Sequence, residues 1–149
     1  MRVRSATAED LPALARLFDA YRVFYQQPTD LAAATAFLRQ REEAGDSTVF
    51  VAEDAGRALV GFTQLYASLS SVSLARIYVL NDLYVDPAAR RSGVARALIE
   101  AAHAFARSQS AVRVSLETAH DNHGAQRLYE SLGYERDSHF FRYHWRRDG

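Results

Sequence analysis

Residues 83–95 (LYVDPAARRSGVA) constrain the fold of this chain more than any other segment. Alternating apolar residues lead into Pro87, a corner of basic and small residues follows, and an amphipathic helix is predicted from Ser92 to about Arg107. A strand that turns directly into a helix presents the first backbone N–H groups of that helix without intrahelical partners. Because such groups bind anions, the segment predicts an anion site.

Hydrophobic periodicity along the rest of the chain predicts one α/β (α+β) domain over residues 1–149. The expected element order is β-α-α-β-β-β-α-β-α-β-β, with a largely antiparallel first half and at least one strand–helix–strand crossover. Apolar alternation predicts the strands, and apolar residues at steps of three and four predict the helices. The strands are expected at 2–6, 48–52, 58–66, 76–85, 112–116 and 140–145, and the helices at 11–25, 29–43, 92–107 and 122–132.

The composition excludes several kinds of function. The formal net charge is zero at pH 7, which predicts no general attraction to nucleic acid or to an anionic membrane. The chain has no cysteine, so disulfides, thiolate metal sites and a cysteine nucleophile are excluded. Its five histidines show no metal-ligand spacing, and no apolar run is long enough for a signal peptide or a membrane span. We therefore expect a cytoplasmic protein without a metal.

Two motifs, about 30 residues apart, resemble those of the GNAT superfamily of acyl-CoA-dependent N-acyltransferases. Arg90-x-x-Gly93-x-Ala95 is similar to the pyrophosphate-binding signature Q/R-x-x-G-x-G/A of that superfamily. Residues 122–134 (NHGAQRLYESLGY) resemble its N-x-x-A-x-x-[LF]-Y-x-x-x-G-[FY] motif. Read without this resemblance, the first motif is a strand-to-helix turn with a solvated pair of arginines.

The resemblance implies a mixed, mostly antiparallel sheet of about seven strands flanked by four helices, with acetyl-CoA as cosubstrate and no metal. Gly93 would let the backbone approach the diphosphate closely, and the two neighbouring arginines would add charge. Backbone groups of the preceding strand would pair with pantetheine like an added strand. The residues expected to bind coenzyme A are Leu83, Tyr84, Val85, Arg90, Arg91, Ser92, Gly93, Val94, Ala95 and Asn122.

The same resemblance implies the catalytic roles. Tyr129 would protonate the departing thiolate, while its alternative role is that of a core aromatic, and the alternative role of Asn122 is a helix N-cap. Residues 80–85 (LNDLYV) look like the L-E-D-[LF]-[FY]-V phrase of the spermidine/spermine N-acetyltransferase branch, whose Glu deprotonates the amine. Asn81 stands at that position and cannot act as a base. We therefore expect the nearest carboxylate, Asp82, to take this role, with a solvated or substrate-binding acid as its alternative.

The acceptor is expected to be a primary amine of a small molecule, such as a polyamine or an amino acid. The expected substrate contacts are Phe24, Asn81 and Asp82. Tyr21 and Tyr25 belong to the apolar stripe of the first helix and are expected in the core, whereas Phe24 lies off that stripe. Two alternatives stay open, namely a protein or peptide N-acetyltransferase and a non-catalytic acyl-CoA-binding regulatory module. A generic nucleotide-binding domain is disfavoured, because neither G-x-G-x-x-G nor G-x-x-x-x-G-K-[ST] occurs. The aromatic C-terminal strand could form a homodimer interface.

Overall fold

The structure, a computed structural model, describes residues 1–148. Its contacts divide the chain into two compact units, residues 1–117 and the residues from 118 onward. The first unit contains the sheet and three α-helices, and the described part of the second contains one α-helix and an extended tail. A single domain over residues 1–149 therefore stays a prediction.

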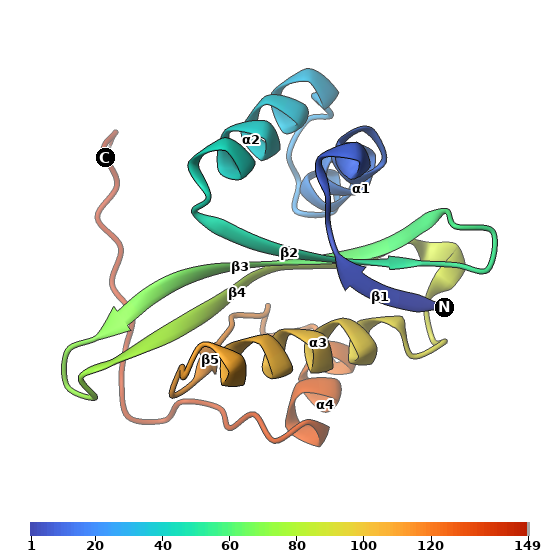
Figure 1. The fold of residues 1–149 in the computed structure, drawn as a ribbon. Coiled ribbons are helices and arrows are strands. Elements are labelled where there is room, and N and C mark those ends of the chain that lie inside the picture. Colours follow the sequence, from blue (N-terminus) through green and yellow to red (C-terminus); the bar gives the residue numbers. More distant parts are fainter. Residues whose placement is uncertain (149) are drawn as a thin grey trace. The chain divides into compact units, whose positions relative to one another are not determined.

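The first unit is built on a five-stranded sheet whose strands lie in chain order, as Figure 1 shows. Neighbouring strands among the first four pair antiparallel, and the fifth is parallel to the fourth, as a strand–helix–strand crossover requires. The strands are β1 (Arg2–Ser5), β2 (Ser47–Glu53), β3 (Leu59–Ser70), β4 (Ala75–Val85) and β5 (Val114–Ser115).

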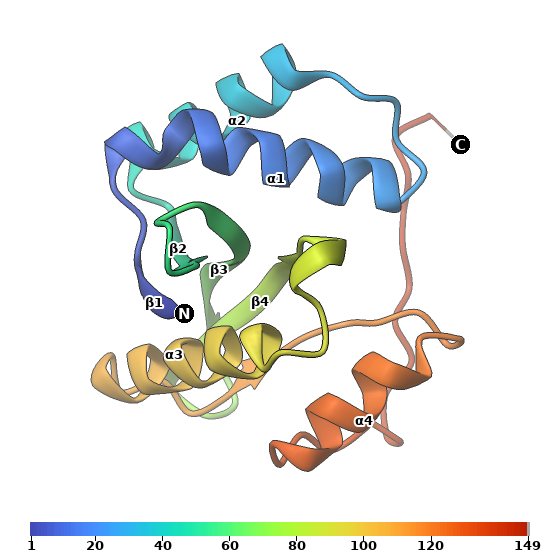
Figure 2. The same cartoon turned by 90° about the vertical axis from the view of Figure 1, so that its right-hand side faces the viewer.

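Helices cover both faces of this sheet (Figures 1 and 2). α1 (Leu11–Phe24) and α2 (Leu31–Ala44) lie on one face, and α3 (Val94–Ser108) lies on the other. Short 3-10 turns at Ala8–Asp10 and Pro87–Ala89 precede α1 and α3. The core on the α1 and α2 face contains Phe18 and Phe62, and the core on the α3 face contains Leu98.

β4 alternates as its sequence predicts. Tyr84 packs against the core on the α1 and α2 face, whereas Leu83 and Val85 pack against the core on the α3 face. Successive side chains of a strand point to opposite faces, so Asp82 shares the face of Tyr84. This puts the candidate base on the side of the sheet that α1 and α2 cover.

A β-bulge interrupts the pairing of β3 with β4 at Asn81. Gln64 of β3 pairs with Asp82, whereas the next residue, Leu65, pairs with Leu80. Asn81 is therefore the extra residue of β4 and has no partner on β3. A bulge bends its strand and re-aims the side chains beside it.

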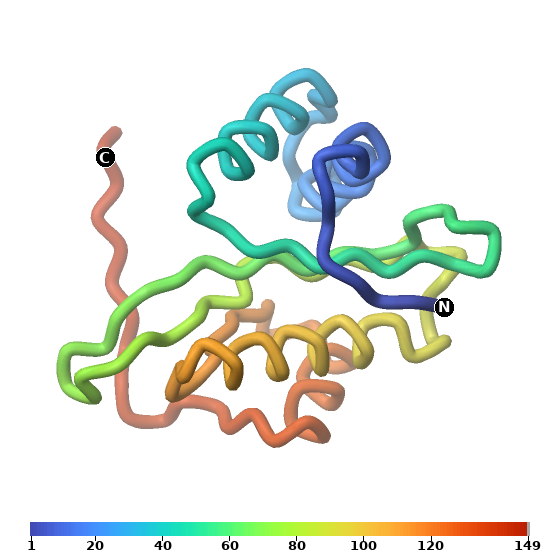
Figure 3. Tube along the Cα trace, viewed as in Figure 1, coloured from blue at the N-terminus to red at the C-terminus, as the bar shows by residue number. Residues whose placement is uncertain are grey.

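In the second unit, α4 (His123–Ser131) lies within the range 122–132 that the sequence predicts, and the two end residues of that range are its caps. Asn122 is the N-cap, and its side-chain oxygen accepts a hydrogen bond from the Ala125 N–H at 3.3 Å. Gly133 follows the helix with a φ of +94°, the left-handed conformation that commonly ends a helix. Residues 135–148 then run as a tail without regular secondary structure (Figure 3).

The prediction of about seven strands is wrong, because the described residues form a sheet of five strands. The observed order follows the predicted one through α4, but the last two strands, including the one expected at 140–145, are missing. A strand needs a neighbouring strand to satisfy its backbone groups. In the tail, the His139 and Phe140 N–H groups instead donate to the Asp137 side chain, at 2.9 and 3.3 Å.

Other predicted bounds need smaller corrections. α2 begins at Leu31, and its N-cap is Asp30, whose carboxylate accepts a hydrogen bond from the Ala33 N–H at 3.0 Å. β5 is Val114–Ser115 rather than the whole of 112–116.

Candidate active site

The corner between β4 and α3 has a backbone conformation suited to an anion. Gly93 is the N-cap of α3, and its φ of +82° lies in the left-handed region that favours glycine. A Cβ built on Gly93 would meet no non-neighbouring atom within 4 Å, so the corner is open beside it. Arg91 precedes it with a φ of +63°. Because the first N–H groups of α3 lack intrahelical partners, a diphosphate fits this corner.

Arg90 connects this corner to the end of β4. Its Nε donates to the Val85 carbonyl oxygen at 3.0 Å. Its guanidinium carbon lies 5.6 Å from the centroid of the Tyr84 ring and 6.0 Å from that of Phe24. These contacts give Arg90 a structural role, and its expected role in binding coenzyme A stays a prediction. Arg91 is exposed.

One edge of β4 is open between Leu80 and Val85. β3 pairs with the opposite edge along this stretch. β5 pairs with β4 at Tyr78 and Val79, and within residues 1–148 no strand pairs with this edge beyond that point. An extended ligand can add to such an edge through backbone hydrogen bonds. The open edge leads through Pro87–Ala89 into the corner before α3, so both predicted contact regions for the cosubstrate lie along one continuous path.

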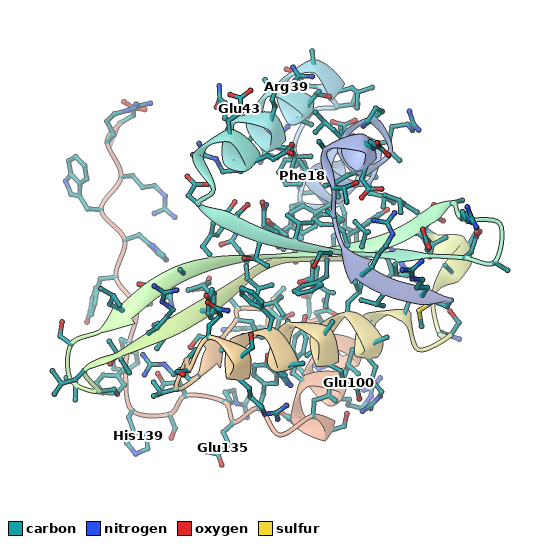
Figure 4. The ribbon with its side chains drawn as sticks, viewed as in Figure 1. Phe18, Arg39, Glu43, Glu100, Glu135 and His139 are labelled. Atoms are coloured by element: carbon teal, nitrogen blue, oxygen red, sulfur yellow. The ribbon has the colours of Figure 1, made fainter. Side chains whose placement is uncertain are left out.

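A cavity of about 450 Å³ lies on the α1 and α2 face of the sheet, a volume typical of small-molecule sites. In Figure 4, Phe18 lies between α1 and the sheet, whereas Arg39 and Glu43 lie on the outer side of α2. The walls of the cavity are mostly aromatic and apolar. The lining residues are Phe18, Tyr21, Arg22, Ala33, Ala34, Phe37, Tyr66, Asn81 and Asp82.

Asp82 provides a carboxylate in the wall of this cavity. The residue is 4% exposed, and its two oxygens accept hydrogen bonds from Gln64 Nε2 at 2.7 Å and from Asn81 Nδ2 at 3.1 Å. Both partners donate amide N–H groups, so each carboxylate oxygen is held in a fixed direction. Asn81, which cannot be the base, therefore orients the carboxylate next to it, and Asn81 and Asp82 both line the cavity as expected.

Sequence analysis missed Gln64, which is fully buried at 0% exposure. Its Nε2 donates to Asp82, and its Oε1 has no partner among the described residues. The available signal was a polar amide inside the apolar strand predicted at 58–66, since a buried amide requires a hydrogen-bond partner. Only the register of β3 against β4 identifies that partner as Asp82.

Two tyrosines border the carboxylate. Tyr21 Oη donates to the Asn81 carbonyl oxygen at 3.2 Å, and burial together with the negative charge of Asp82 raises the pKa of Tyr21 well above its usual range. Burial and the same charge raise the pKa of Tyr66 to about 12. Both phenols are therefore neutral hydroxyl groups at physiological pH. Tyr21, predicted to be a core residue, packs in the core and also lines the cavity.

Phe24 and Tyr25 are not among the residues that line the cavity. Phe24 is 53% exposed and is absent from the lining, although its ring lies 5.3 Å from that of Tyr25. Tyr25 is also exposed, so its prediction as a core residue is wrong. Tyr129 belongs to the second unit, where its ring and that of Tyr134 form a T-shaped pair with centroids 5.9 Å apart. The roles of Phe24 and Tyr129 stay predictions.

No three His, Cys, Asp or Glu side chains gather in a group that could hold a metal ion, within the part of the chain that the structure describes. Over the same residues, no helix has the length and hydropathy needed to cross a membrane.

Comparison with known proteins identifies the family. Residues 12–134 match the Acetyltransferase (GNAT) family. YhfO, an uncharacterized N-acetyltransferase of Bacillus subtilis (strain 168), is 46% identical over 143 residues, which make up 96% of this chain and 95% of that protein. A crystal structure of a probable acetyltransferase has a TM-score of 0.93 and 41% identity, covering 98% of this chain and 97% of the other.

A more distant relative is named for its substrate class. The D-amino-acid N-acetyltransferase HPA3 of Saccharomyces cerevisiae is 37% identical over 78 residues, which make up 52% of this chain and 48% of that protein. Taken together with the family match, these similarities show that this chain belongs to the GNAT acetyltransferase family. It is therefore an acetyltransferase enzyme.

Proposed function

We propose that this enzyme transfers the acetyl group of acetyl-CoA directly to a primary amine of a small molecule, in the cytoplasm. The observation that carries the proposal is the buried carboxylate of Asp82, which lines an aromatic cavity of small-molecule size. The open edge of β4 and the anion corner before α3 follow it in the chain. The proposed site for acetyl-CoA and the proposed cavity for the acceptor amine therefore both include residues of β4.

In the donor half, backbone groups of Leu83–Val85 would pair with pantetheine, and the corner from Arg90 to Ala95 would hold the diphosphate. The open space beside Gly93 and the unpaired edge of β4 support this assignment. Asn122 would add a contact from the second unit, beyond its observed role as an N-cap. Bound acetyl-CoA supplies an acyl thioester.

In the acceptor half, Asp82 would take a proton from the ammonium group of the substrate. An alkyl ammonium group has a pKa of about 10.4 and has no lone pair for attack until it is deprotonated. The free amine then attacks the thioester carbonyl and forms the C–N bond, and a backbone N–H of β4 near Tyr84 would stabilise the resulting tetrahedral oxyanion. Collapse of this intermediate breaks the C–S bond and releases the thiolate. Tyr129 would give its proton to the departing sulfur.

Two observations favour a small acceptor over a protein lysine or N-terminus. The cavity has a limited volume, about 450 Å³, and aromatic walls. Residues 80–85 also resemble the spermidine/spermine branch, whose substrates are small amines. Asn81 departs from the pattern of that branch, and this departure favours a non-catalytic acyl-CoA-binding module as the second candidate. The observed hydrogen bond from Asn81 to Asp82 supports the enzyme instead, because Asn81 would orient the carboxylate of the base.

A turnover screen tests the proposal. Acetyl-CoA is mixed with polyamines, amino acids, aminoglycosides and short peptides in separate reactions, and the released thiol is measured. We expect amine-dependent release of coenzyme A with at least one small amine, and weak release with peptides. Acetyl-CoA binding without amine-dependent release would support the binding module, and peptides as the best acceptors would support the protein acetyltransferase.

We also propose that the protein is a homodimer whose interface includes residues 140–145 of the tail. Four large aromatic side chains of this segment are exposed, and clusters of exposed apolar side chains mark interaction sites. An extended segment without a neighbouring strand can satisfy its backbone by pairing with a sheet edge of a second copy. The exposed fractions are 83% for Phe140, 91% for Phe141, 89% for Tyr143 and 87% for Trp145.

Light scattering over a dilution series tests the dimer. We expect a mass twice that of the 16.7 kDa chain, and a shift to monomer in a Phe141→Ser/Trp145→Ser double variant. His139→Gln is the control, because it changes an exposed polar residue of the same tail. A wild-type protein that is monomeric at every concentration rules the dimer out.

A further inference from the structure

We propose that the acceptor is an amine that also bears a carboxylate, such as an amino acid, and that Arg22 binds this carboxylate at the cavity wall. The inference rests on the proposed function, because it assigns the acceptor of the same site. It follows from two opposite charges in one cavity, Asp82 from β4 and Arg22 from the last turn of α1.

Among the residues of the cavity wall, Asp82 is suited to the ammonium end of such a molecule. It is almost fully buried, and its hydrogen bonds come from the amides of Gln64 and Asn81 rather than from a cation. The phenols of Tyr21 and Tyr66 are neutral, and within residues 1–148 no ion pair joins Arg22, the cation of the lining, to Asp82, so the carboxylate has no paired positive charge beside it. An ammonium ion would supply that charge, and the aromatic walls would favour it further.

Arg22 is suited to the carboxylate end. Within residues 1–148 its guanidinium group forms no ion pair. The nearest acid along the helix is Asp19, whose oxygens accept hydrogen bonds from the Thr29 hydroxyl and the Asp30 N–H. Asp19 interacts with the charge of Arg22 without forming an ion pair. Guanidinium groups bind carboxylates through two parallel hydrogen bonds.

The other arginine near this cavity is already paired. Arg41 Nη1 lies 3.2 Å from Asp46 Oδ2, and its guanidinium carbon lies 5.1 Å from the centroid of the Phe37 ring. Arg22 is therefore the lining residue that has a positive charge to offer to a ligand. A polyamine would bring a second ammonium group toward Arg22, whereas a zwitterion matches both charges.

The simplest alternative role for Arg22 is stabilisation of α1, because a cation in the last turn of a helix interacts favourably with the helix dipole. That role predicts a loss of thermal stability without any change in substrate preference. The two roles are therefore separated by comparing acceptors rather than by activity alone.

The experiment compares acceptors that share one skeleton: phenylalanine in both enantiomers, phenylalaninamide and 2-phenylethylamine, with the alanine and ethylamine series in parallel. We expect the wild-type kcat/KM to be about 10- to 100-fold higher for the amino acids than for the amides and amines, as a charge-assisted hydrogen bond to the substrate implies. Arg22→Gln should bring the amino acids down to the level of their amides, mainly through KM. Arg22→Lys should restore part of the preference, and Arg39→Gln, on the outer side of α2, should retain it all.

Three outcomes overturn the inference while leaving the proposed function intact. The wild-type enzyme could use the amides or amines as well as the amino acids, an acceptor without a carboxylate could be best in the turnover screen, or Arg22→Gln could lower every acceptor equally. The wild-type comparison decides the question even if a variant does not fold. If no amine releases coenzyme A, the proposed function itself fails.

Discussion

An Asp82→Asn variant is expected to lose about 10²- to 10⁴-fold in kcat/KM at neutral pH, the usual contribution of a general base. The substitution keeps the size of the side chain but removes the group that accepts the proton of the ammonium ion. The carboxylate is nearly buried and is held by Gln64 at 2.7 Å and Asn81 at 3.1 Å, so water has poor access to replace it as the base. Initial rates of coenzyme A release at saturating acetyl-CoA measure the loss.

The pH dependence separates a base from a merely structural carboxylate. At pH 7 an amine with a pKa of about 10.4 is free in only about one molecule per 2,500, and this fraction rises tenfold with each pH unit. Without a base, the variant depends on that free fraction, so its kcat/KM should rise about tenfold per pH unit below the pKa of the amine, and the gap to wild type should narrow. A gap that stays constant across pH would contradict the role of Asp82 as the base.

Two controls accompany this variant. Glu43→Gln removes an exposed carboxylate from the outer side of α2 and should leave turnover unchanged. Thermal unfolding of Asp82→Asn shows whether the buried site is intact, because Gln64 Nε2 can still donate to the amide oxygen that replaces a carboxylate oxygen. A large loss of stability would assign part of the rate loss to unfolding.

The faces of β4 could be predicted from the sequence because burial in a strand has a period of two. Alternation predicts Leu83 and Val85 on one face and Asp82 with Tyr84 on the other, and the structure packs Leu83 and Val85 against one core and Tyr84 against the other. The Gly93 corner was predictable for a similar reason. A positive φ before a helix is a local property that the residue type indicates.

The cavity could not be predicted in the same way, because its wall is assembled from α1, α2, β3 and β4. In the sequence, Arg22 is simply a basic residue in the last turn of a predicted helix. Its neighbours along the chain do not indicate that it lines the same cavity as Asp82. The positions of Gln64 and Asn81 beside Asp82 depend on the register in which β3 pairs with β4. The bulge lies at an asparagine with no glycine beside it, so no residue type marks it.

The tail has the sequence pattern of a strand without forming one. Phe141, Tyr143 and Trp145 alternate with polar residues as they would in a strand, yet residues 140–145 form none. Alternation reports which side chains could share an apolar face, but a strand also needs backbone partners. In the proposed dimer, a second copy would supply both an apolar surface and backbone partners to residues 140–145. These residues would then form a strand only in the dimer.

Tyr129→Phe is expected to lower kcat about 10²-fold or more while leaving the affinity for acetyl-CoA unchanged, because the hydroxyl would act only as the C–S bond breaks. A model thiol has a pKa of about 8.5 and a phenol about 10, so a full proton transfer to a free thiolate costs about 2 kcal/mol. The transfer therefore helps only while the C–S bond is breaking, when the sulfur is more basic and still close to the hydroxyl. Stopped-flow or steady-state release of coenzyme A gives kcat, and calorimetric titration of acetyl-CoA gives the Kd.

Tyr134→Phe is the matched control, since the two rings form one T-shaped pair, and burial next to Tyr129 raises the pKa of Tyr134 to about 12. If the pair has only a packing role, the two variants should behave alike, because each keeps its ring and loses one hydroxyl group worth about 1 kcal/mol of stability. A catalytic role predicts that they differ, with turnover lost at Tyr129 and retained at Tyr134. Unchanged turnover of Tyr129→Phe at saturating acetyl-CoA would remove Tyr129 as the acid and would leave the departing thiolate to take its proton from water.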